Sequence, residues 1–234
     1  MTSSTIALPT NDGACPAYLA MPERANGAAV VVLQEIFGVN ANIRAIADDH
    51  AAHGYLAIAP DLFWRQRPGV DLDPSDPASR DTAMTLMQDL DQSLAVADAE
   101  TAARYVRARA GGKVGAVGYC LGGKLAYFLA MTGAIEAAVS YYGTGIHAAL
   151  DRADAVACPL LLHVAQEDNL CPPEAQAALR ERFEPMGDRV TIEEYAGVGH
   201  AFARRGAPTC DTACADRADA ETAAFFARHL GAGA

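Results

Sequence analysis

A cysteine at position 120 lies where a chain could place a nucleophile. The stretch Gly118-Tyr119-Cys120-Leu121-Gly122 separates an apolar, strand-like run from a helical pattern. A sharp strand-to-helix turn exposes its apex residue, and glycines two positions away on either side avoid collisions with the neighbouring strand and helix. The N-terminus of the following helix would favour a thiolate and an oxyanion. The pattern predicts a nucleophilic thiol; the alternative is a buried cysteine packed between glycines.

Two candidate partners follow Cys120 in the chain order of hydrolases with such a turn, which is nucleophile, acid, histidine. Asp168 comes just after the apolar run 160–165, and His200 lies in a glycine-containing loop after the run 189–195. A histidine can take and return the protons of acyl transfer, and a carboxylate can orient it. We therefore predict a Cys120–His200–Asp168 triad.

Other residues of catalytic type receive different interpretations. Glu167 is the rival acid, but Asp168 lies farther into the loop and is preferred. His163 sits inside an apolar run and is expected in the core. Cys210 and Cys214 form a C-x3-C pair without the second pair or histidines of a zinc site, so we interpret them as incidental thiols and expect no metal.

The elements that must position these residues alternate between strand and helix. This alternation predicts an α/β fold, a mostly parallel sheet with helices on both faces, in one domain spanning 1–234. Residues 64–80 are rich in Pro, Asp and Arg and predict a surface excursion, and the tail 231–234 is expected to fray. Strands are expected at 28–34, 55–59, 113–117, 137–142, 160–165 and 189–195, and helices at 40–53, 82–110, 121–132, 173–184 and 214–230.

Composition narrows the classes of partner. The chain has 234 residues, of which 51% are hydrophobic, and a formal net charge of −11, so nucleic acid and anionic membranes are not expected partners. No apolar stretch is as long as the roughly 18 residues that a membrane-spanning helix needs, and the N-terminus does not resemble a signal peptide. Six cysteines without a secretion signal favour reduced thiols in the cytoplasm. No cofactor is expected.

Several motifs together resemble the dienelactone hydrolase family, over about Val31 to His229. The specific feature is a cysteine where most hydrolases of the α/β-hydrolase fold carry serine. The resemblance implies that fold and a monomeric hydrolase that opens enol-lactones during breakdown of aromatic, often chlorinated, compounds. The motifs are LQEIFGVN at 33–40, GYLAIAPDLF at 54–63, GYCLGG at 118–123, SYYGTG at 140–145, the Asp168 loop and GHAFARR at 199–205.

The resemblance also assigns roles around the nucleophile. It implies that Glu35 lies beside Cys120 and that the cysteine rests as a neutral thiol. Substrate binding would then move Glu35 so that it accepts the thiol proton. The backbone N–H groups of Ile36 and Leu121 would form the oxyanion hole.

The implied substrate is a small carboxylated lactone. Arg204 and Arg80 match positions that bind its carboxylate, which suits a fork-shaped guanidinium. Tyr142 or Tyr141 would line the pocket, with Phe37 and Phe202 as walls. The sequence departs from the family at three positions: Met84 and Met87, where aromatic residues are common, and Ala201, where serine is common.

These departures leave the chemistry intact but widen the choice of substrate. One alternative is a broader carboxylesterase or thioesterase with the same triad. An alternative of another class is a non-catalytic redox-sensing or binding protein on this fold, which would leave Asp168 and His200 without a role.

Overall fold

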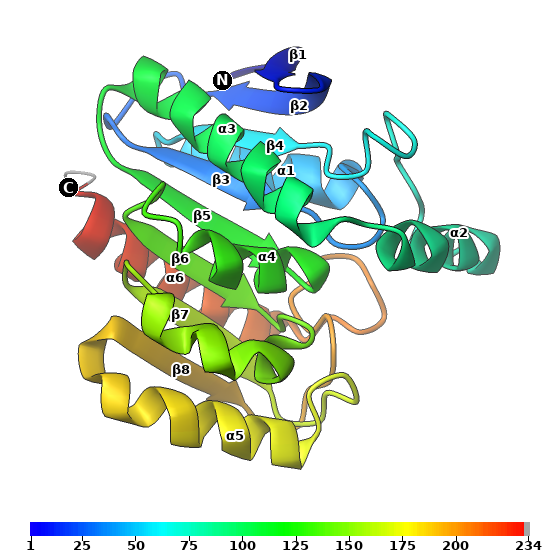
Figure 1. Cartoon of the computed structure of the whole chain (residues 1–234), viewed down its shortest axis with the longest axis vertical. Coiled ribbons are helices and arrows are strands. Elements are labelled where there is room, and N and C mark those ends of the chain that lie inside the picture. The colour runs from blue at the N-terminus through cyan, green and yellow to red at the C-terminus, as the bar shows by residue number, and fades with distance from the viewer. Residues whose placement is uncertain (232–234) are drawn as a thin grey trace.

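The computed structural model describes residues 1–231, which are built around one eight-stranded sheet (Figure 1). The strand order is β1-β2-β4-β3-β5-β6-β7-β8. From β4 onwards in this order every neighbouring pair is parallel, whereas β1 pairs with β2 and β2 with β4 in the antiparallel sense. The strands are β1 (Thr2–Thr10), β2 (Gly13–Met21), β3 (Ala29–Leu33), β4 (Leu56–Pro60), β5 (Val114–Tyr119), β6 (Ala137–Tyr141), β7 (Leu160–Ala165) and β8 (Val190–Tyr195).

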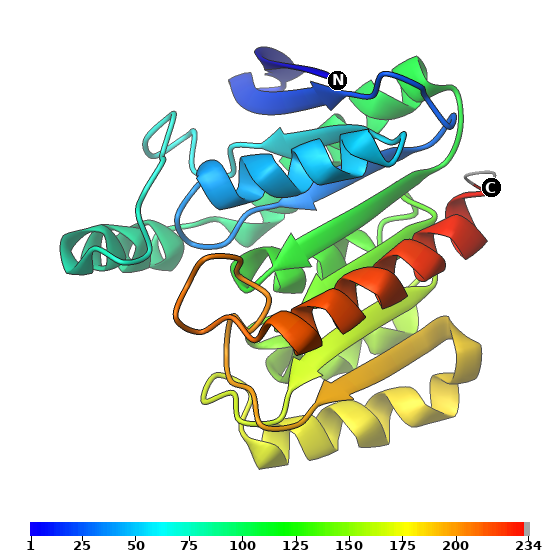
Figure 2. The same ribbon diagram turned by 180° about the vertical axis from the view of Figure 1, so that it is seen from behind.

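Helices cover both faces of the sheet. In Figure 1, α3, α4 and α5 lie in front of the sheet, and Figure 2 shows α1 and α6 on the opposite face. The helices are α1 (Ala41–Ala52), α2 (Pro77–Gln88), α3 (Gln92–Ala110), α4 (Leu121–Leu129), α5 (Pro173–Phe183) and α6 (Thr212–Leu230), with 3-10 segments η1 (Ile146–Ala155) and η2 (Glu184–Arg189). The expected mostly parallel sheet with helices on both faces is confirmed.

Two features differ from the sequence expectations. The first 21 residues form an antiparallel hairpin, β1 and β2, where no strand was predicted. The helical pattern expected over 82–110 is divided between two helices. α2 already begins at Pro77, within the expected excursion, and α3 begins anew because the Asp91 side chain accepts hydrogen bonds from the N–H groups of Ser93 and Leu94. The expected tail at 231–234 falls almost entirely outside the described residues.

The central strands are buried along their whole length. Every residue of β3, β4, β5, β6 and β7 is buried, which is the pattern of parallel strands covered on both faces. The carboxyl ends of parallel strands meet at one edge, where loops collect functional side chains. Among residues 1–231, no helix combines the length and apolar character needed to cross a bilayer.

Candidate active site

Cys120 forms the turn between β5 and α4 in a strained backbone conformation. Its φ of 54° lies in the left-handed region that non-glycine residues rarely adopt. The neighbouring strand end holds it there. The Cys120 N–H donates to the carbonyl of Tyr141 at 3.0 Å, and the Cys120 carbonyl accepts from the N–H of Thr144 at 3.2 Å. The turn therefore presents the sulfur at the N-terminus of α4.

The flanking glycines are required by close backbone contacts. A Cβ added at Gly118 would lie 2.0 Å from the carbonyl oxygen of Gly122. A Cβ added at Gly122 would lie 2.2 Å from the carbonyl oxygen of Leu33. Both distances are far below any real contact, so the strand, the turn and the helix approach one another only because these positions lack side chains. The predicted reason for the glycines is confirmed.

His200 and Asp168 form a hydrogen-bonded pair in the loops that follow β8 and β7. Nδ1 of His200 lies 2.8 Å from Oδ2 of Asp168. The second carboxylate oxygen accepts a 2.8 Å hydrogen bond from the N–H of Leu170. Asp168 is only 3% exposed, whereas Glu167 points to solvent. The preference for Asp168 over Glu167 as the partner of the histidine agrees with this geometry.

The surroundings of His200 favour its charged form. Burial works against a charged ring, but the Asp168 carboxylate and the Cys120 sulfur outweigh it and raise the His200 pKa to about 10. Nε2, on the other edge of the ring, is buried and makes no hydrogen bond within residues 1–231. This nitrogen is therefore free to exchange a proton with a substrate or a water molecule.

A second buried pair, the ion pair of Glu35 and Arg204, lies beside the His200–Asp168 pair, which we call the dyad. Both nitrogens of an Arg204 fork, Nε and Nη2, donate to the two carboxylate oxygens of Glu35, at 2.8 and 2.9 Å. Glu35 is 1% exposed and the Arg204 side chain 11%, and the guanidinium lies 5.2 Å from the ring centre of Phe37. Each charge needs the other, because an unpaired charge in such surroundings is costly.

Tyr142 connects this ion pair to the histidine. It follows β6 with a φ of 39°, and its ring meets the His200 ring edge-on at 5.1 Å. Its hydroxyl is buried without a hydrogen-bond partner among the described residues. Burial and the negative charges of Glu35 and Cys120 raise its pKa well above the usual value, so the phenol stays neutral. Of the two tyrosines considered, Tyr142 faces the site, while Tyr141 bonds to Asp219 and Thr222.

Two backbone donors lie where an oxyanion hole is expected. Leu121 is the first residue of α4, and Ile36 follows β3 two residues after Gln34. Neither N–H donates a hydrogen bond to any group of residues 1–231. Both residues are buried, so the two N–H groups lack a protein partner in a place with little access for water.

Comparison with known proteins decides the family. A sequence model of the Dienelactone hydrolase family matches residues 15–230. The chain belongs to the dienelactone hydrolase family. It is 38% identical over 207 residues to the carboxymethylenebutenolidases of Pseudomonas putida and of Pseudomonas knackmussii strain B13, covering 87% of this chain and 87% of each relative. The protein is therefore a carboxylic ester hydrolase.

Solved structures agree with this assignment. A Klebsiella pneumoniae protein assigned as a dienelactone hydrolase superposes with a TM-score of 0.85 at 26% identity, over 97% of this chain and 99% of that one. A dienelactone hydrolase from Anabaena variabilis, at 17% identity and a TM-score of 0.71, shares the fold over 98% of both chains. The α/β-hydrolase fold predicted from the motifs is confirmed.

The remaining predicted site residues are not gathered at the His200–Asp168 pair in the same way. Arg80 and Met84 are exposed on α2, which Figure 1 shows projecting on the side to which the parallel strands point. The Arg80 side chain makes no hydrogen bond or ion pair within residues 1–231, and Met87 is half-buried. Phe202 is fully buried behind Tyr142, with ring centres 5.6 Å apart, so it supports that ring and has no exposed face of its own.

Residues set aside in the sequence are accounted for as well. His163 is buried in β7, where its two ring nitrogens bond to the hydroxyls of Tyr195 and Thr222, so its interpretation as a core residue is confirmed. Residues 1–231 contain no cluster of His, Cys, Asp and Glu that could hold a metal ion. The pairing of Glu35 with Arg204 was missed in the sequence, because 169 positions separate the two residues.

Proposed function

We propose that this dienelactone hydrolase opens a carboxylated enol-lactone with Cys120 as nucleophile, His200 as proton carrier and Asp168 as the group that orients His200. The observation that supports this most strongly is the strained turn at Cys120, whose sulfur lies close enough to the hydrogen-bonded His200–Asp168 pair to help raise the His200 pKa. A residue held at such a φ persists only because its surroundings impose it, and this is common at active sites.

Substrate binding begins with an exchange of ion pairs. The Arg204 guanidinium is held by Glu35 and would present the same fork to a substrate carboxylate. When the substrate carboxylate pairs with Arg204, the Glu35 carboxylate loses its partner in a buried site. Accepting the proton of the Cys120 thiol neutralises it and leaves a thiolate beside His200. The nucleophile would then form only when a substrate is present.

Acylation follows from the thiolate. The Cys120 sulfur attacks the lactone carbonyl carbon, and the N–H groups of Ile36 and Leu121 stabilise the oxyanion. The carbon–oxygen bond of the ring breaks, and the enolate leaves with its electron pair and takes up the Nε2 proton of the His200 imidazolium, which leaves that ring neutral. An enolate is a good leaving group, so a thiolate is sufficient as nucleophile.

Deacylation uses the free edge of His200. Nε2, left neutral when the enolate took its proton, accepts a proton from water as the water oxygen attacks the thioester carbonyl, and Asp168 stabilises the imidazolium that forms. Collapse of the second tetrahedral intermediate breaks the carbon–sulfur bond and releases the product acid, which loses its proton to solvent. The departing thiolate takes back the proton held by Glu35, which restores the thiol and the Glu35 carboxylate. A lactone of this class arises in the breakdown of aromatic compounds, which is the process we propose for this enzyme.

A broader ester substrate is the second candidate. Met84 is 38% exposed and Met87 is half-buried on α2, so this helix presents flexible side chains to its surroundings. Methionine adapts to ligands of different shape. A wider range of lactones, esters or thioesters would use the same triad.

The test is the loss of dienelactone absorbance with the purified enzyme, run beside hydrolysis of p-nitrophenyl acetate. Fast lactone opening with weak ester cleavage would support the proposal, and the reverse profile would support the broader esterase. Cys120→Ala should lower both rates at least about a thousand-fold. Cys158→Ala is the matched control, because Cys158 is also buried but lies away from the dyad. Substantial turnover by Cys120→Ala would sink the assignment of the nucleophile.

A further inference from the structure

A second concavity lies on the face of the sheet shown in Figure 2, between α1 and α6. It encloses about 780 Å³. The groove exists because α1 packs on β2, β3 and β4, whereas α6 packs on β5, β6 and β7. We call it the α1–α6 groove. It is lined by Ala45 of α1, by Ala223 and Phe226 of α6, and by three tyrosines: Tyr55 just before β4, Tyr119 at the end of β5 and Tyr141 at the end of β6.

Aromatic rings form the floor of the α1–α6 groove. The Tyr119 ring, at the end of β5, stacks on Tyr141 with ring centres 4.6 Å apart and planes at 29°. His50 of α1 lies edge-on to both Tyr55 and Phe226, at 6.1 and 5.9 Å. Burial lowers the pKa of His50 to about 4, so this ring is neutral at physiological pH. Neutral aromatic rings offer a surface that attracts organic cations.

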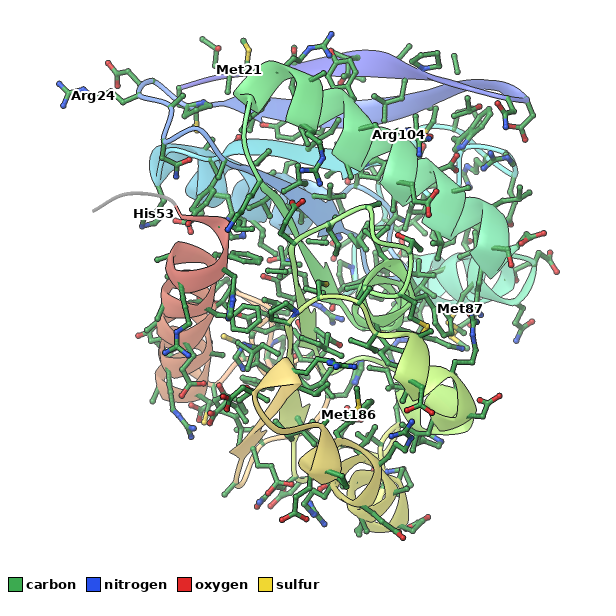
Figure 3. All side chains as sticks on the ribbon, turned by 60° about the vertical axis from the view of Figure 1, so that its left-hand side comes forward. Met21, Arg24, His53, Met87, Arg104 and Met186 are labelled. Atoms are coloured by element: carbon green, nitrogen blue, oxygen red, sulfur yellow. The ribbon has the colours of Figure 1, made fainter. Side chains whose placement is uncertain are left out.

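The charge around the groove has the complementary sign. Three carboxylates, of Asp49, Asp216 and Asp219, face one guanidinium, that of Arg205. Arg205 already bonds to Asp216 at 2.7 Å and to Asp219 at 2.5 Å. Asp49 has no Lys or Arg partner within residues 1–231 and approaches only Nδ1 of His53, at 3.5 Å. Figure 3 labels His53, which stands at the end of α1. The groove therefore carries an excess of negative charge.

One neutral polar group in the groove also lacks a protein partner. Nδ2 of Asn42 is buried without a hydrogen-bond acceptor in the described part of the chain. Buried polar groups are nearly always paired, so this amide points to an acceptor oxygen supplied from outside the chain.

We propose that the α1–α6 groove binds a small organic cation with an aromatic or aliphatic body and an acceptor oxygen. The ammonium group would lie near Asp49, the body over Tyr119, and the oxygen within reach of Asn42. The volume falls within the range of small-molecule sites. This site is separate from the dyad, although Tyr119 precedes Cys120 and Tyr141 precedes Tyr142 on the same two strand ends.

The test measures binding by calorimetry and needs no turnover, so it is independent of the proposed lactone hydrolysis. The Cys120→Ala variant is used, so that no acyl-enzyme can form at the catalytic site. Three probes of similar shape are compared: 4-methoxyphenethylamine (a cation), its N-acetyl derivative (neutral) and 3-(4-methoxyphenyl)propionate (an anion). We expect only the cation to bind, with an affinity that falls as salt is added.

Variants locate the probe. Ala223→Phe fills the groove and should abolish binding, whereas Ala224→Phe, on the adjacent exposed residue outside the lining, should not. Asp49→Asn should weaken binding about threefold to tenfold, and Asp188→Asn, on an exposed aspartate of η2, should leave it unchanged. Arg205→Gln removes the competing cation and should tighten binding about threefold.

Two outcomes would overturn the proposal. Equal affinity for the three probes would show that charge does not select the ligand. Binding that survives Ala223→Phe would place the probe elsewhere. Sedimentation of the Cys120→Ala protein completes the test, because a dimer disrupted by Ala223→Phe but not by Ala224→Phe would mean that a second copy occupies the groove.

Discussion

Two buried histidines of this enzyme lie in opposite electrostatic surroundings. His163, inside β7, bonds to the hydroxyls of Tyr195 at 2.8 Å and Thr222 at 2.9 Å, and burial lowers its pKa to about 3. His200, in the loop after β8, is also largely buried but bonds to the Asp168 carboxylate. Despite that burial, Asp168 and the Cys120 sulfur raise its pKa to about 10.

The difference shows that the charge of the partner decides the state of a buried histidine. In β7, neutral hydroxyls satisfy the His163 ring without charging it. The Glu221 carboxylate lies 3.8 Å from Nδ1, beyond hydrogen-bond distance, and accepts from the Tyr195 hydroxyl instead. The loops at the carboxyl edge supply a carboxylate and a thiol, which make proton transfer possible. The interior of the sheet thus contains a structural histidine, His163, while the loops at its carboxyl edge contain one suited to proton transfer, His200.

The comparison predicts its largest effect for matched substitutions of the two histidines. His200→Gln should lower kcat/KM for lactone opening by about a thousand-fold, because no group remains to carry the proton of water. His163→Gln should lower it only about twofold, since an amide can still bond to both hydroxyls. Steady-state kinetics of the two purified variants measure both values.

The control for this pair is the melting temperature of each variant, because His200→Gln leaves the buried Asp168 carboxylate with a neutral partner. The contrast between a structural and a catalytic histidine would be wrong if the folded His163→Gln enzyme lost as much activity as the folded His200→Gln enzyme. Both histidines would then belong to one catalytic network.

A second prediction concerns the ion pair beside His200. Arg204→Gln should lower kcat/KM for a carboxylated lactone about tenfold to a hundredfold more than for p-nitrophenyl acetate, which has no carboxylate to bind. General damage from leaving Glu35 unpaired would lower kcat/KM for both substrates alike, so the ratio of the two losses isolates the effect on carboxylate binding. Equal losses for both substrates would remove Arg204 from substrate recognition.

The exchange of ion pairs predicts a third effect, an increase of about tenfold in the rate at which Cys120 is alkylated. 2-Furoate, an unreactive planar carboxylate, should accelerate alkylation of Cys120 by iodoacetamide, because it takes Arg204 and frees Glu35 to accept the thiol proton. Glu35→Gln should not respond, and neither should Arg204→Gln. Alkylation that is already fast at pH 7 without 2-furoate would mean that His200 alone ionises the sulfur.

Much of this site follows from local sequence. Cys120, Asp168 and His200 each come directly after a predicted strand, and parallel strands bring their carboxyl ends to one edge, so chain order alone places the three residues together. Gly118 and Gly122 predict the tight turn: a side chain at Gly118 would collide with Gly122 within the turn, whereas the lack of one at Gly122 leaves room for Leu33 of the neighbouring strand β3. The turn was predictable because its glycine pattern lies within a few residues, although part of the steric cause lies in another strand.

Other features depend on contacts that sequence does not encode locally. The hairpin β1–β2 lies at the edge of the sheet, where β1 is mostly exposed and lacks the continuous apolar run of a buried strand. The Glu35–Arg204 pair joins residues distant in the chain. The α1–α6 groove results from the spacing of two helices over the sheet, which no pattern within either helix reveals.

The last prediction concerns stability and separates the two histidines by the sign of their pH dependence. His163 has a lowered pKa in the folded enzyme, so the unfolded chain binds more protons as pH falls from about 6.5 toward 3, and stability is lost over that range. His200 has a raised pKa, so its contribution is complete below about pH 6.5 and is lost as pH rises through about 10.

Urea unfolding between pH 6.5 and 4 measures the first of these slopes. Each histidine held neutral contributes up to about 1.4 kcal/mol per pH unit. His163→Gln should therefore flatten the acid side of the stability profile, even if it lowers the stability at pH 7, while His200→Gln should leave the acid slope unchanged and flatten the alkaline side. His50, whose pKa is lowered to about 4, preserves part of the acid slope in both variants. An acid slope that His163→Gln leaves intact would show that His163 is charged in the folded enzyme, and the contrast between the two histidines would disappear.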